Sequence, residues 1–200
     1  MRILIIGGHG TIGRAVAAEL DKTHEVIRVG RSSGGLRVDL TNFASVQEMF
    51  AEAGALDAVV TTTGKVHFGP LAQMTPEQFT VGLQDKLMGQ INVVLAGQAH
   101  LRDGGSFTLT SGIIADEPIR DGSNATAVNA AIEGFVRAAA TELPRGLRIN
   151  AISPTVLSES MDSYGSYFPG FEPVSGARVA LGYRRSIEGI QTGRVYRIWQ

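Results

Sequence analysis

The amino-acid sequence predicts an α/β fold in which a parallel sheet is covered by helices on both faces. Short apolar runs alternate with longer segments of helical spacing along the 200 residues. This alternation is typical of parallel strands joined by helical crossovers. A cluster of glycines stands between the first apolar run and the first helical segment. Because the length fits one domain with a sizeable core, we expect residues 1–200 to form a single domain.

Seven apolar runs have the length and residue types of strands. They are Ile3–Ile6, Glu25–Val29, Leu36–Val38, Ala58–Thr61, Ser106–Thr110, Leu147–Ile152 and Val195–Ile198. Helical spacing is found between them, at Thr11–Leu20, Ala44–Ala53, Pro76–Leu101, Thr126–Leu143 and Gly176–Ser186.

Residues 153–174 form a long stretch with neither pattern, and they include Pro154, Pro169 and Pro173. A loop of this length in a compact domain is more often functional than idle. Because it follows the end of an expected strand, we expect it to be a substrate loop or lid within the same domain.

Composition narrows the classes of partner. The formal net charge is −1 and Lys and Arg form no cluster, so neither nucleic acid nor an anionic membrane is expected. The absence of cysteine excludes disulfides and thiolate metal ligands, and no metal site is expected from the spacing of His, Asp and Glu. The first apolar run does not resemble a signal peptide, and no stretch approaches the roughly 20 apolar residues of a membrane helix. We expect a cytoplasmic protein with a small-molecule substrate.

The clearest functional signal is the stretch Ile3–Gly13, which reads I-L-I-I-G-G-H-G-T-I-G. A buried strand that enters a glycine turn and then a helix is suited to binding a pyrophosphate. The glycines let the backbone approach the phosphates, and the helix N-terminus presents free N–H groups. The spacing Gly8-x-Gly10-x-x-Gly13 matches the dinucleotide fingerprint, with a plain glycine turn as the alternative. The expected phosphate contacts are Gly7, Gly8, Gly10, Thr11, Ile12 and Gly13.

The residues after the second expected strand favour NADP(H) over NAD(H). An NAD site usually places Asp or Glu about 20 residues after the glycine turn, where it binds the ribose 2′-hydroxyl. This chain has Gly30 there, followed by Arg31, Ser32 and Ser33. A guanidinium with hydroxyl neighbours suits a 2′-phosphate. We expect Arg31 and Ser32 to bind that phosphate; a solvated loop arginine is the alternative.

Further motifs follow in a fixed order. They are Val38-Asp39-Leu40, Thr62-Thr63-Gly64, G-G-S-F-T-L-T-S-G at Gly104–Gly112, R-I-N-A-I-S-P-T at Arg148–Thr155 and T-G-R-V-Y-R-I at Thr192–Ile198. With the glycine turn, this ordered set resembles the short-chain dehydrogenase/reductase family over essentially the whole chain. The resemblance implies a single-domain Rossmann fold, with a doubly wound seven-stranded parallel sheet in the order 3-2-1-4-5-6-7. It also implies a homodimer or homotetramer.

The resemblance further implies where the rest of the dinucleotide lies. Asp39 and Leu40 would flank the adenine. Thr62, Thr63 and Gly64 would belong to the segment in which the family has Asn-Asn-Ala-Gly. The residues lining the nicotinamide would be Pro154, Thr155 and Val156, with Thr155 in place of the usual glycine.

The catalytic residues of the family are only partly present. Its members use a Ser and a Tyr-x-x-x-Lys pair, whose spacing stacks both side chains on one helix face so that the Tyr acts as general acid/base. Ser111 matches the Ser, and we expect it to orient the substrate. The Tyr and Lys positions fall on Ala125 and Asn129, and no Tyr or Lys occurs from Ser111 to Asn150. Asn129 can still bind a ribose hydroxyl, but the usual acid–base pair is absent.

Several side chains are candidates for the missing proton donor. Lys86 stands where the family has an Asn, although an ordinary solvated helix lysine is the favoured interpretation. Tyr164 and Tyr167 lie within residues 153–174, where packing of the lid is favoured. For His67 a loop position without a catalytic role is favoured. Turn or loop positions are expected for His9, Asp116 and Glu117.

Two functions therefore remain open. An enzyme would transfer hydride between NADPH and a small carbonyl, imine or alkene, taking the proton from water, the substrate or a loop residue. A non-catalytic module would bind NADPH and change a partner contact by ordering residues 153–174. Ser111 favours the enzyme, whereas Ala125 and Asn129 favour the module.

Overall fold

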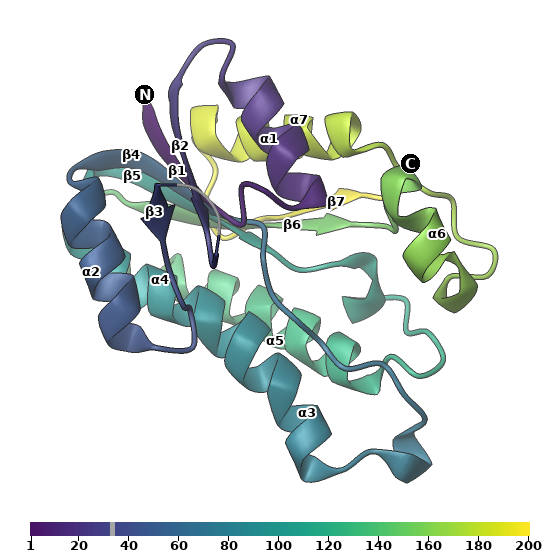
Figure 1. Ribbon diagram of the computed structural model, residues 1–200. Helices are drawn as coiled ribbons and strands as arrows, with labels where there is room; N and C mark the ends of the chain where they lie inside the picture. The colour runs from purple at the N-terminus through teal and green to yellow at the C-terminus, as the bar shows by residue number, and fades with distance from the viewer. Residues whose placement is uncertain (33–34) are drawn as a thin grey trace.

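The computed structural model describes residues 1–32 and 35–200, and these residues form three layers (Figure 1). Within them a seven-stranded parallel sheet has the order β3-β2-β1-β4-β5-β6-β7. Helices α1 (Thr11–Leu20) and α7 (Gly176–Glu188) cover one face of the sheet. Helices α2 (Phe43–Ala53), α4 (Gly89–Gly97) and α5 (Ser123–Ala139) cover the other. The predicted single-domain Rossmann fold and its strand order are confirmed.

The strands lie close to the positions that the apolar runs predict. They are β1 (Arg2–Ile6), β2 (Glu25–Gly30), β3 (Leu36–Arg37), β4 (Leu56–Thr61), β5 (Leu101–Thr110), β6 (Arg148–Pro154) and β7 (Val195–Ile198). Strand β5 begins at Leu101, whereas the apolar run predicts a start at Ser106. The prediction misses the first part of the strand because Arg102-Asp103-Gly104 lack the apolar pattern. Two shorter helices complete the set, α3 (Pro76–Gly82) and α6 (Met161–Tyr164). No helix among the described residues is long and apolar enough to cross a membrane.

The central strand β1 contributes to both hydrophobic cores, because alternate side chains of a strand point to opposite faces of the sheet. Leu4 and Ile6 pack into one core with residues of α2, α4 and α5. Ile3 and Ile5 pack into the other with residues of α1 and α7. All four side chains are at most 1% exposed, and complete burial of each contributes roughly 1.5–3 kcal/mol. Burial on both faces explains why this run is apolar without interruption.

The helical spacing predicted at Pro76–Leu101 is borne out as far as His100, and Leu101 begins β5. The structure divides this segment into α3, a π-helical turn at Leu83–Met88, α4 and a 3-10 turn at Gln98–His100. Apolar spacing does not reveal the π-turn, in which hydrogen bonds join residues five apart instead of four. Such turns occur often at functional sites, and Lys86 lies within this one.

The expected irregular stretch 153–174 is partly helical. Short helical turns follow one another at Ser158–Ser160, Met161–Tyr164 and Gly165–Tyr167. An isolated bridge between Leu157 and Val174 closes the base of the segment. The Glu159 carboxylate accepts hydrogen bonds from the Gly176 N–H at 2.9 and 3.1 Å. These contacts hold the segment at the N-terminus of α7.

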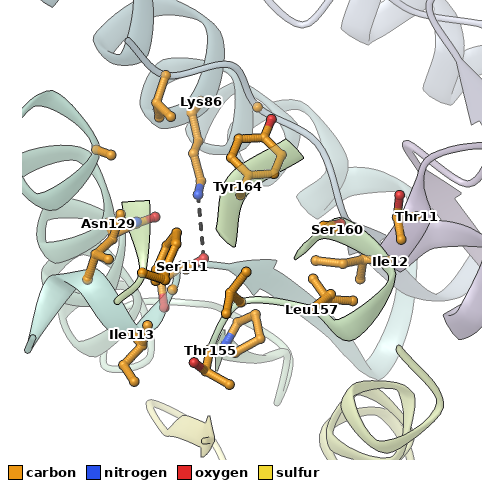
Figure 2. A pocket seen from close by; sticks show the side chains of 18 of the residues that line it. Thr11, Ile12, Lys86, Ser111, Ile113, Asn129, Thr155, Leu157, Ser160 and Tyr164 are labelled. Carbon is orange, nitrogen blue, oxygen red and sulfur yellow. Dashed lines mark hydrogen bonds between the residues drawn. The ribbon is translucent and has the colours of Figure 1, made fainter. Parts of the chain in front are cut away.

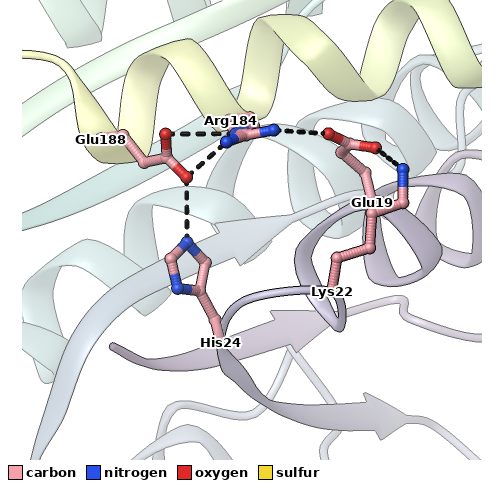
Figure 3. A network of polar contacts seen from close by, with 5 residues as sticks. All are labelled: Glu19, Lys22, His24, Arg184 and Glu188. Atoms are coloured by element: carbon pink, nitrogen blue, oxygen red, sulfur yellow. Dashed lines mark hydrogen bonds and ion pairs between the residues drawn. The ribbon is translucent and has the colours of Figure 1, made fainter.

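A polar network joins α7 to α1 and to the residues just before β2 (Figure 3). Arg184 Nη1 lies 3.0 Å from Glu19 Oε1, and its Nε lies 3.0 Å from Glu188 Oε1. Lys22 pairs with the other oxygen of Glu19, and His24 Nε2 lies 3.1 Å from Glu188 Oε1. Hydrogen bonds from Lys22 and Arg184 lower the pKa of Glu19. This network lies on the helical layer outside the sheet and away from the strand ends where the site is found.

Candidate active site

The glycine turn between β1 and α1 is packed so closely that two of its residues have no room for a side chain. Gly7 has a φ of 82°, and a Cβ on it would lie 2.9 Å from Thr62 Oγ1. A Cβ on Gly13 would lie 2.1 Å from the carbonyl oxygen of Gly7. The Gly7 N–H donates to the carbonyl of Val29 at 2.9 Å, which fixes the turn against β2. The turn and the helix thus approach as closely as a dinucleotide site requires.

Helix α1 begins without a side-chain cap. Its N-cap residue is Gly10, no side chain accepts from its first N–H groups, and its first turn holds no acidic residue. By contrast α2, α3 and α7 are capped by the side chains of Asn42, Thr75 and Ser175. The first N–H groups of α1 are therefore available to an anion, in the direction that the helix dipole favours.

A small cavity of about 60 Å³ lies beside the glycine turn. Residues expected at the cofactor that line it are Gly7, Arg31, Asp39, Leu40 and Thr63. Arg31 Nη2 pairs with Asp39 Oδ2 at 3.0 Å. Hydrogen bonds from the hydroxyl and N–H of Thr41, and then the charge of Arg31, lower the pKa of Asp39. Ser32 is exposed outside this lining, and Ser33 lies outside the described residues.

A larger cavity of about 520 Å³ opens at the C-terminal ends of the central strands, next to the start of α1 (Figure 2). Ligands of open α/β sheets bind at this edge. The residues singled out in the sequence that line it are Thr11, Ile12, Thr62, Gly64, Lys86, Ser111, Ala125, Asn129, Pro154, Thr155, Val156 and Tyr164. Gly8, Gly10 and Gly13 lie outside both linings, and the phosphate contacts expected of the turn and the first residues of α1 all stay predictions.

Ser111 lies at this cavity, but its hydroxyl turns toward α5. The hydroxyl donates to Glu133 Oε1 at 2.9 Å and lies 3.4 Å from the carbonyl oxygen of Ile152. Burial raises the pKa of Glu133, whose side chain lies behind the serine. This contact is not predicted from the sequence, although Glu133 follows Asn129 by one helical turn and so shares its face of α5. The role expected for Ser111, orienting the substrate, stays a prediction.

Lys86 enters the cavity from the π-helical turn. Its ammonium points toward the strand ends and donates to the carbonyl oxygen of Ser111 at 3.4 Å (Figure 2). A Cβ on Gly64 would lie 2.3 Å from Lys86 Cγ, so the side chain passes directly over this glycine. Burial lowers the pKa of Lys86 to about 8. The favoured expectation of a solvated helix lysine is therefore wrong.

Two polar groups at the cavity have no hydrogen-bond partner among the described residues. They are Asn129 Oδ1 and Thr155 Oγ1, and both residues are at most 3% exposed. Buried polar atoms are nearly always satisfied, so each such atom fits a ligand group that completes it. Ala125 is fully buried beside Asn129 and offers only a methyl group.

The remaining candidate proton donors are less well placed than Lys86. Tyr167 packs against Phe68 in a tilted arrangement with ring centroids 4.9 Å apart, and Asp116 pairs with Arg197 at 3.0 Å. His67 lies outside the lining of the large cavity, with its backbone N–H bonded to Asn124. The exposed residues His9 and Glu117 also lie outside that lining. Within residues 1–32 and 35–200 no group of three His, Cys, Asp or Glu side chains could hold a metal ion.

The strand order, the close-packed glycine turn and the uncapped helix define a Rossmann-type dinucleotide-binding protein. Residues 11–195 match the family model described as enoyl-(acyl carrier protein) reductase. The chain belongs to the short-chain dehydrogenase/reductase family, whose members are oxidoreductases that bind nicotinamide cofactors.

Individual relatives agree with this assignment. The hydroxynaphthalene reductase arp2 of Aspergillus fumigatus is 30% identical over 86% of this chain and 72% of its own length. The crystal structure of the protein lin1944 from Listeria innocua is 47% identical, covers both chains completely and has a TM-score of 0.98. A small-chain dehydrogenase in complex with NADPH is 26% identical, with 99% and 96% of the two chains covered and a TM-score of 0.88.

Proposed function

We propose that this chain binds NADP(H) and transfers hydride between it and a small carbonyl-type substrate, without the Tyr-x-x-x-Lys pair of the family. One observation carries the proposal. A single cavity reaches from the first turn of α1, at Thr11 and Ile12, to the polar groups of Lys86, Ser111 and Asn129. When bound at the glycine turn, the dinucleotide would supply a hydride at these groups.

The residues present fit this cofactor. The free N–H groups at the start of α1 suit the pyrophosphate. The unpartnered Asn129 Oδ1 can accept a hydrogen bond from a ribose hydroxyl, and Thr155 Oγ1 can bond the nicotinamide beside Pro154 and Val156. Each contact would complete a buried polar atom of the chain, which favours binding.

The preference for NADP(H) rests on Arg31. Its pairing with Asp39 holds the guanidinium at the small cavity beside the glycine turn, where an adenosine 2′-phosphate would accept its hydrogen bonds. The NADPH complex of the related small-chain dehydrogenase supports the same choice. NAD(H) is the second cofactor to test.

The walls of the large cavity indicate the substrate class. They are mainly apolar and include Val66, Phe68, Val81, Ile113, Ile114 and Phe168. An uncharged carbonyl compound with an apolar body fits such walls. The name of the Aspergillus relative gives hydroxynaphthalene as its substrate, so bicyclic aromatic ketones are the first compounds to test. Because Tyr164 and Phe168 line the same cavity, residues 153–174 would form its lid.

The test has two stages. Calorimetry first measures the dissociation constants of NADPH and NADH, and NADPH is expected to bind more tightly. Oxidation of NADPH is then followed with 1-tetralone, 2-tetralone and a panel of aliphatic ketones. Tight binding with turnover supports the proposal, and failure to bind either dinucleotide overturns it.

The second candidate is a non-catalytic NADP(H)-responsive module. Ala125 and Asn129 favour it, because we propose that they occupy the Tyr and Lys positions and neither can donate a proton at neutral pH. NADPH binding without turnover, together with slower hydrogen exchange in residues 153–174, would favour this module over the enzyme.

We also propose that the chain forms a homodimer or homotetramer. Leu95 on α4 is 52% exposed and Leu181 on α7 is 54% exposed, on opposite faces of the sheet. These two side chains mark outer helical faces that contacts between copies of the chain could cover, and the proposal itself rests on the family resemblance. Light scattering on the purified protein measures the oligomeric state, and a monomer at all concentrations would contradict the proposal.

A further inference from the structure

We propose that Lys86 binds the substrate oxygen and donates a proton to it, in place of the tyrosine that this chain lacks. The inference rests on the proposed function, and it supplies the acid that the proposed reaction still needs. Four features of the described residues support it: the path of the side chain, the partners of its ammonium, the neighbouring ionisable groups and the polarity of the cavity.

The path of the Lys86 side chain is fixed by its surroundings. The residue lies in the π-helical turn Leu83–Met88, and its stem crosses Gly64. A Cβ on Gly64 would lie 2.6 Å from Lys86 Cβ and 2.3 Å from Lys86 Cγ. An alanine there would therefore displace the stem, so the glycine and the lysine fit one another. In Figure 2 the ammonium lies between Asn129 and Tyr164 and points toward Ser111.

The ammonium has spare hydrogen-bonding capacity. It carries three N–H donors, and one of them bonds the carbonyl oxygen of Ser111 at 3.4 Å. No carboxylate among the described residues forms an ion pair with it; Asp85, the nearby acid on the same turn, accepts the N–H of Lys65 at 2.6 Å. A cation held in an apolar cavity with free donors is suited to binding an oxygen atom on which negative charge develops.

The neighbouring ionisable groups are less suited to this role. Tyr164 on α6 is 45% exposed, and in Figure 2 its hydroxyl points away from the Lys86 ammonium and Ser111. Lys65 lines the cavity but is exposed. Glu133 on α5 is separated from the cavity by Ser111, and its carboxylate accepts a hydrogen bond from the Ser111 hydroxyl.

With Lys86 as the acid, every group transferred in the proposed reaction has a source. The cofactor, when bound, would supply a hydride to the carbonyl carbon, and the electron pair of the breaking C=O π bond would move to oxygen. An N–H proton of Lys86 passes to that oxygen, which leaves an alcohol and a neutral amine. The amine regains a proton from solvent at the open mouth of the cavity. A lysine that burial brings to a pKa of about 8 gives up its proton near neutral pH far more readily than an exposed lysine.

The first test does not depend on turnover. Competitive acetylation over a pH series, read by peptide mass spectrometry, follows the reactivity of Lys86 in the free protein. The exposed Lys22, which follows the C-terminal end of α1, serves as internal reference for the reagent. We expect the reactivity of Lys86 to rise to its plateau with a midpoint near pH 8. A midpoint above pH 10, the range of an unperturbed lysine, would overturn the inference.

The second test compares variants that separate charge from proton donation. Lys86→Met keeps the stem and removes the ammonium, whereas Lys86→Arg keeps a cation that holds its proton. We expect either change to lower kcat of ketone reduction about 10²- to 10⁴-fold, with little change in NADPH affinity. In the parent protein kcat is expected to fall as the pH rises through about 8, because Lys86 loses its proton. Lys86→Arg is expected to abolish that dependence.

The outcomes keep the two proposals apart. If the parent protein binds no dinucleotide, the proposed function fails. If it reduces a ketone and Lys86→Met retains the parent kcat and pH profile, the function stands and the inference is overturned. If it binds NADPH but reduces nothing in the panel, both lose their support. Lys22→Met, which removes a surface charge far from the cavity, is the control and is expected to match the parent protein.

Discussion

The two ends of the large cavity are built in different ways. The cofactor end, where Thr11 and Ile12 line the cavity beside the glycine turn Gly7–Gly13, consists mainly of backbone groups in close approach. The reaction end, formed by Lys86, Ser111 and Asn129, consists of groups from the π-helical turn, β5 and α5. The first end is specified by consecutive residues, whereas the second is assembled by the packing of distant segments.

This difference bears on how each end tolerates substitution. At the cofactor end a methyl group added at Gly13 would lie 2.1 Å from the Gly7 carbonyl oxygen and 2.7 Å from Gly8 Cα. At the reaction end the fold accommodates Ala125 and Asn129 in a buried position while leaving the cavity open. The chemistry of the reaction end can therefore change within an intact fold, but a side chain added at Gly7 or Gly13 would force the turn and α1 apart.

The largest expected effect is that of Gly13→Ala. The new Cβ would lie 2.1 Å from the Gly7 carbonyl oxygen and 2.7 Å from Gly8 Cα, so α1 and the turn must separate. Overpacking of this kind costs typically 1–3 kcal/mol of unfolding free energy, and more where backbone meets backbone. We expect a lower urea midpoint and loss of NADPH binding in calorimetry. A variant that keeps the parent affinity would contradict the close-approach account of the cofactor end.

A matched control is offered by Gly134, which lies in α5 with nothing within 4 Å of a Cβ built on it. Gly134→Ala is expected to raise stability by roughly 0.5–1 kcal/mol, because alanine is the better helix former. It is also expected to leave NADPH affinity unchanged. The same chemical change therefore acts in opposite directions at the two sites.

The same contrast explains what could be predicted from the sequence. The glycine turn and the strands follow from local patterns, whereas the order of the strands follows from the family resemblance; the structure bears out both. The direction of the Ser111 hydroxyl was not predictable, because it depends on Glu133 from a different element. The sequence favours a solvated position for Lys86, because helical spacing alone does not reveal the π-turn in which this residue lies. The route of this side chain into the cavity depends on Gly64, a contact between separate segments that no local pattern reveals.

A smaller effect is expected for Arg31→Ala, which tests the cofactor end through a side chain. Loss of hydrogen bonds between the guanidinium and a 2′-phosphate costs about 1.5–3 kcal/mol, which corresponds to roughly a 10- to 100-fold weaker NADPH affinity. NADH lacks that phosphate, so its affinity is expected to stay near the parent value. Equal losses for the two dinucleotides in calorimetry would remove the assignment of Arg31.

Thr155→Val tests whether the unpartnered hydroxyl at the cavity serves a ligand. The hydroxyl is buried without a partner among the described residues, so replacing it with a methyl group is expected to leave the Tm of the free protein unchanged or slightly higher. If the hydroxyl bonds the cofactor, NADPH should then raise the Tm less than it does in the parent protein. An unchanged NADPH-induced shift would show that Thr155 makes no such bond.

The smallest effect is expected for a substitution in the polar network between α1 and α7. This network stabilises the helical layer behind both the cofactor end and the reaction end of the cavity. Hydrogen bonds from Lys22 and Arg184 lower the pKa of Glu19 below its ordinary value of 4.5. The carboxylate therefore contributes stability above that value, and the contribution is lost as the pH falls through the lowered pKa. Glu19→Gln should lower Tm only slightly at neutral pH, because its partners Lys22 and Arg184 are exposed and solvent screens their charges. In strong acid it should not lower Tm at all, because the carboxylate is then protonated in the parent protein. NADPH affinity and the pH profile of ketone reduction should match the parent protein. A change in either one would mean that the cofactor end and the reaction end depend on the spacing of the helical layer behind the sheet, as well as on the residues that line them.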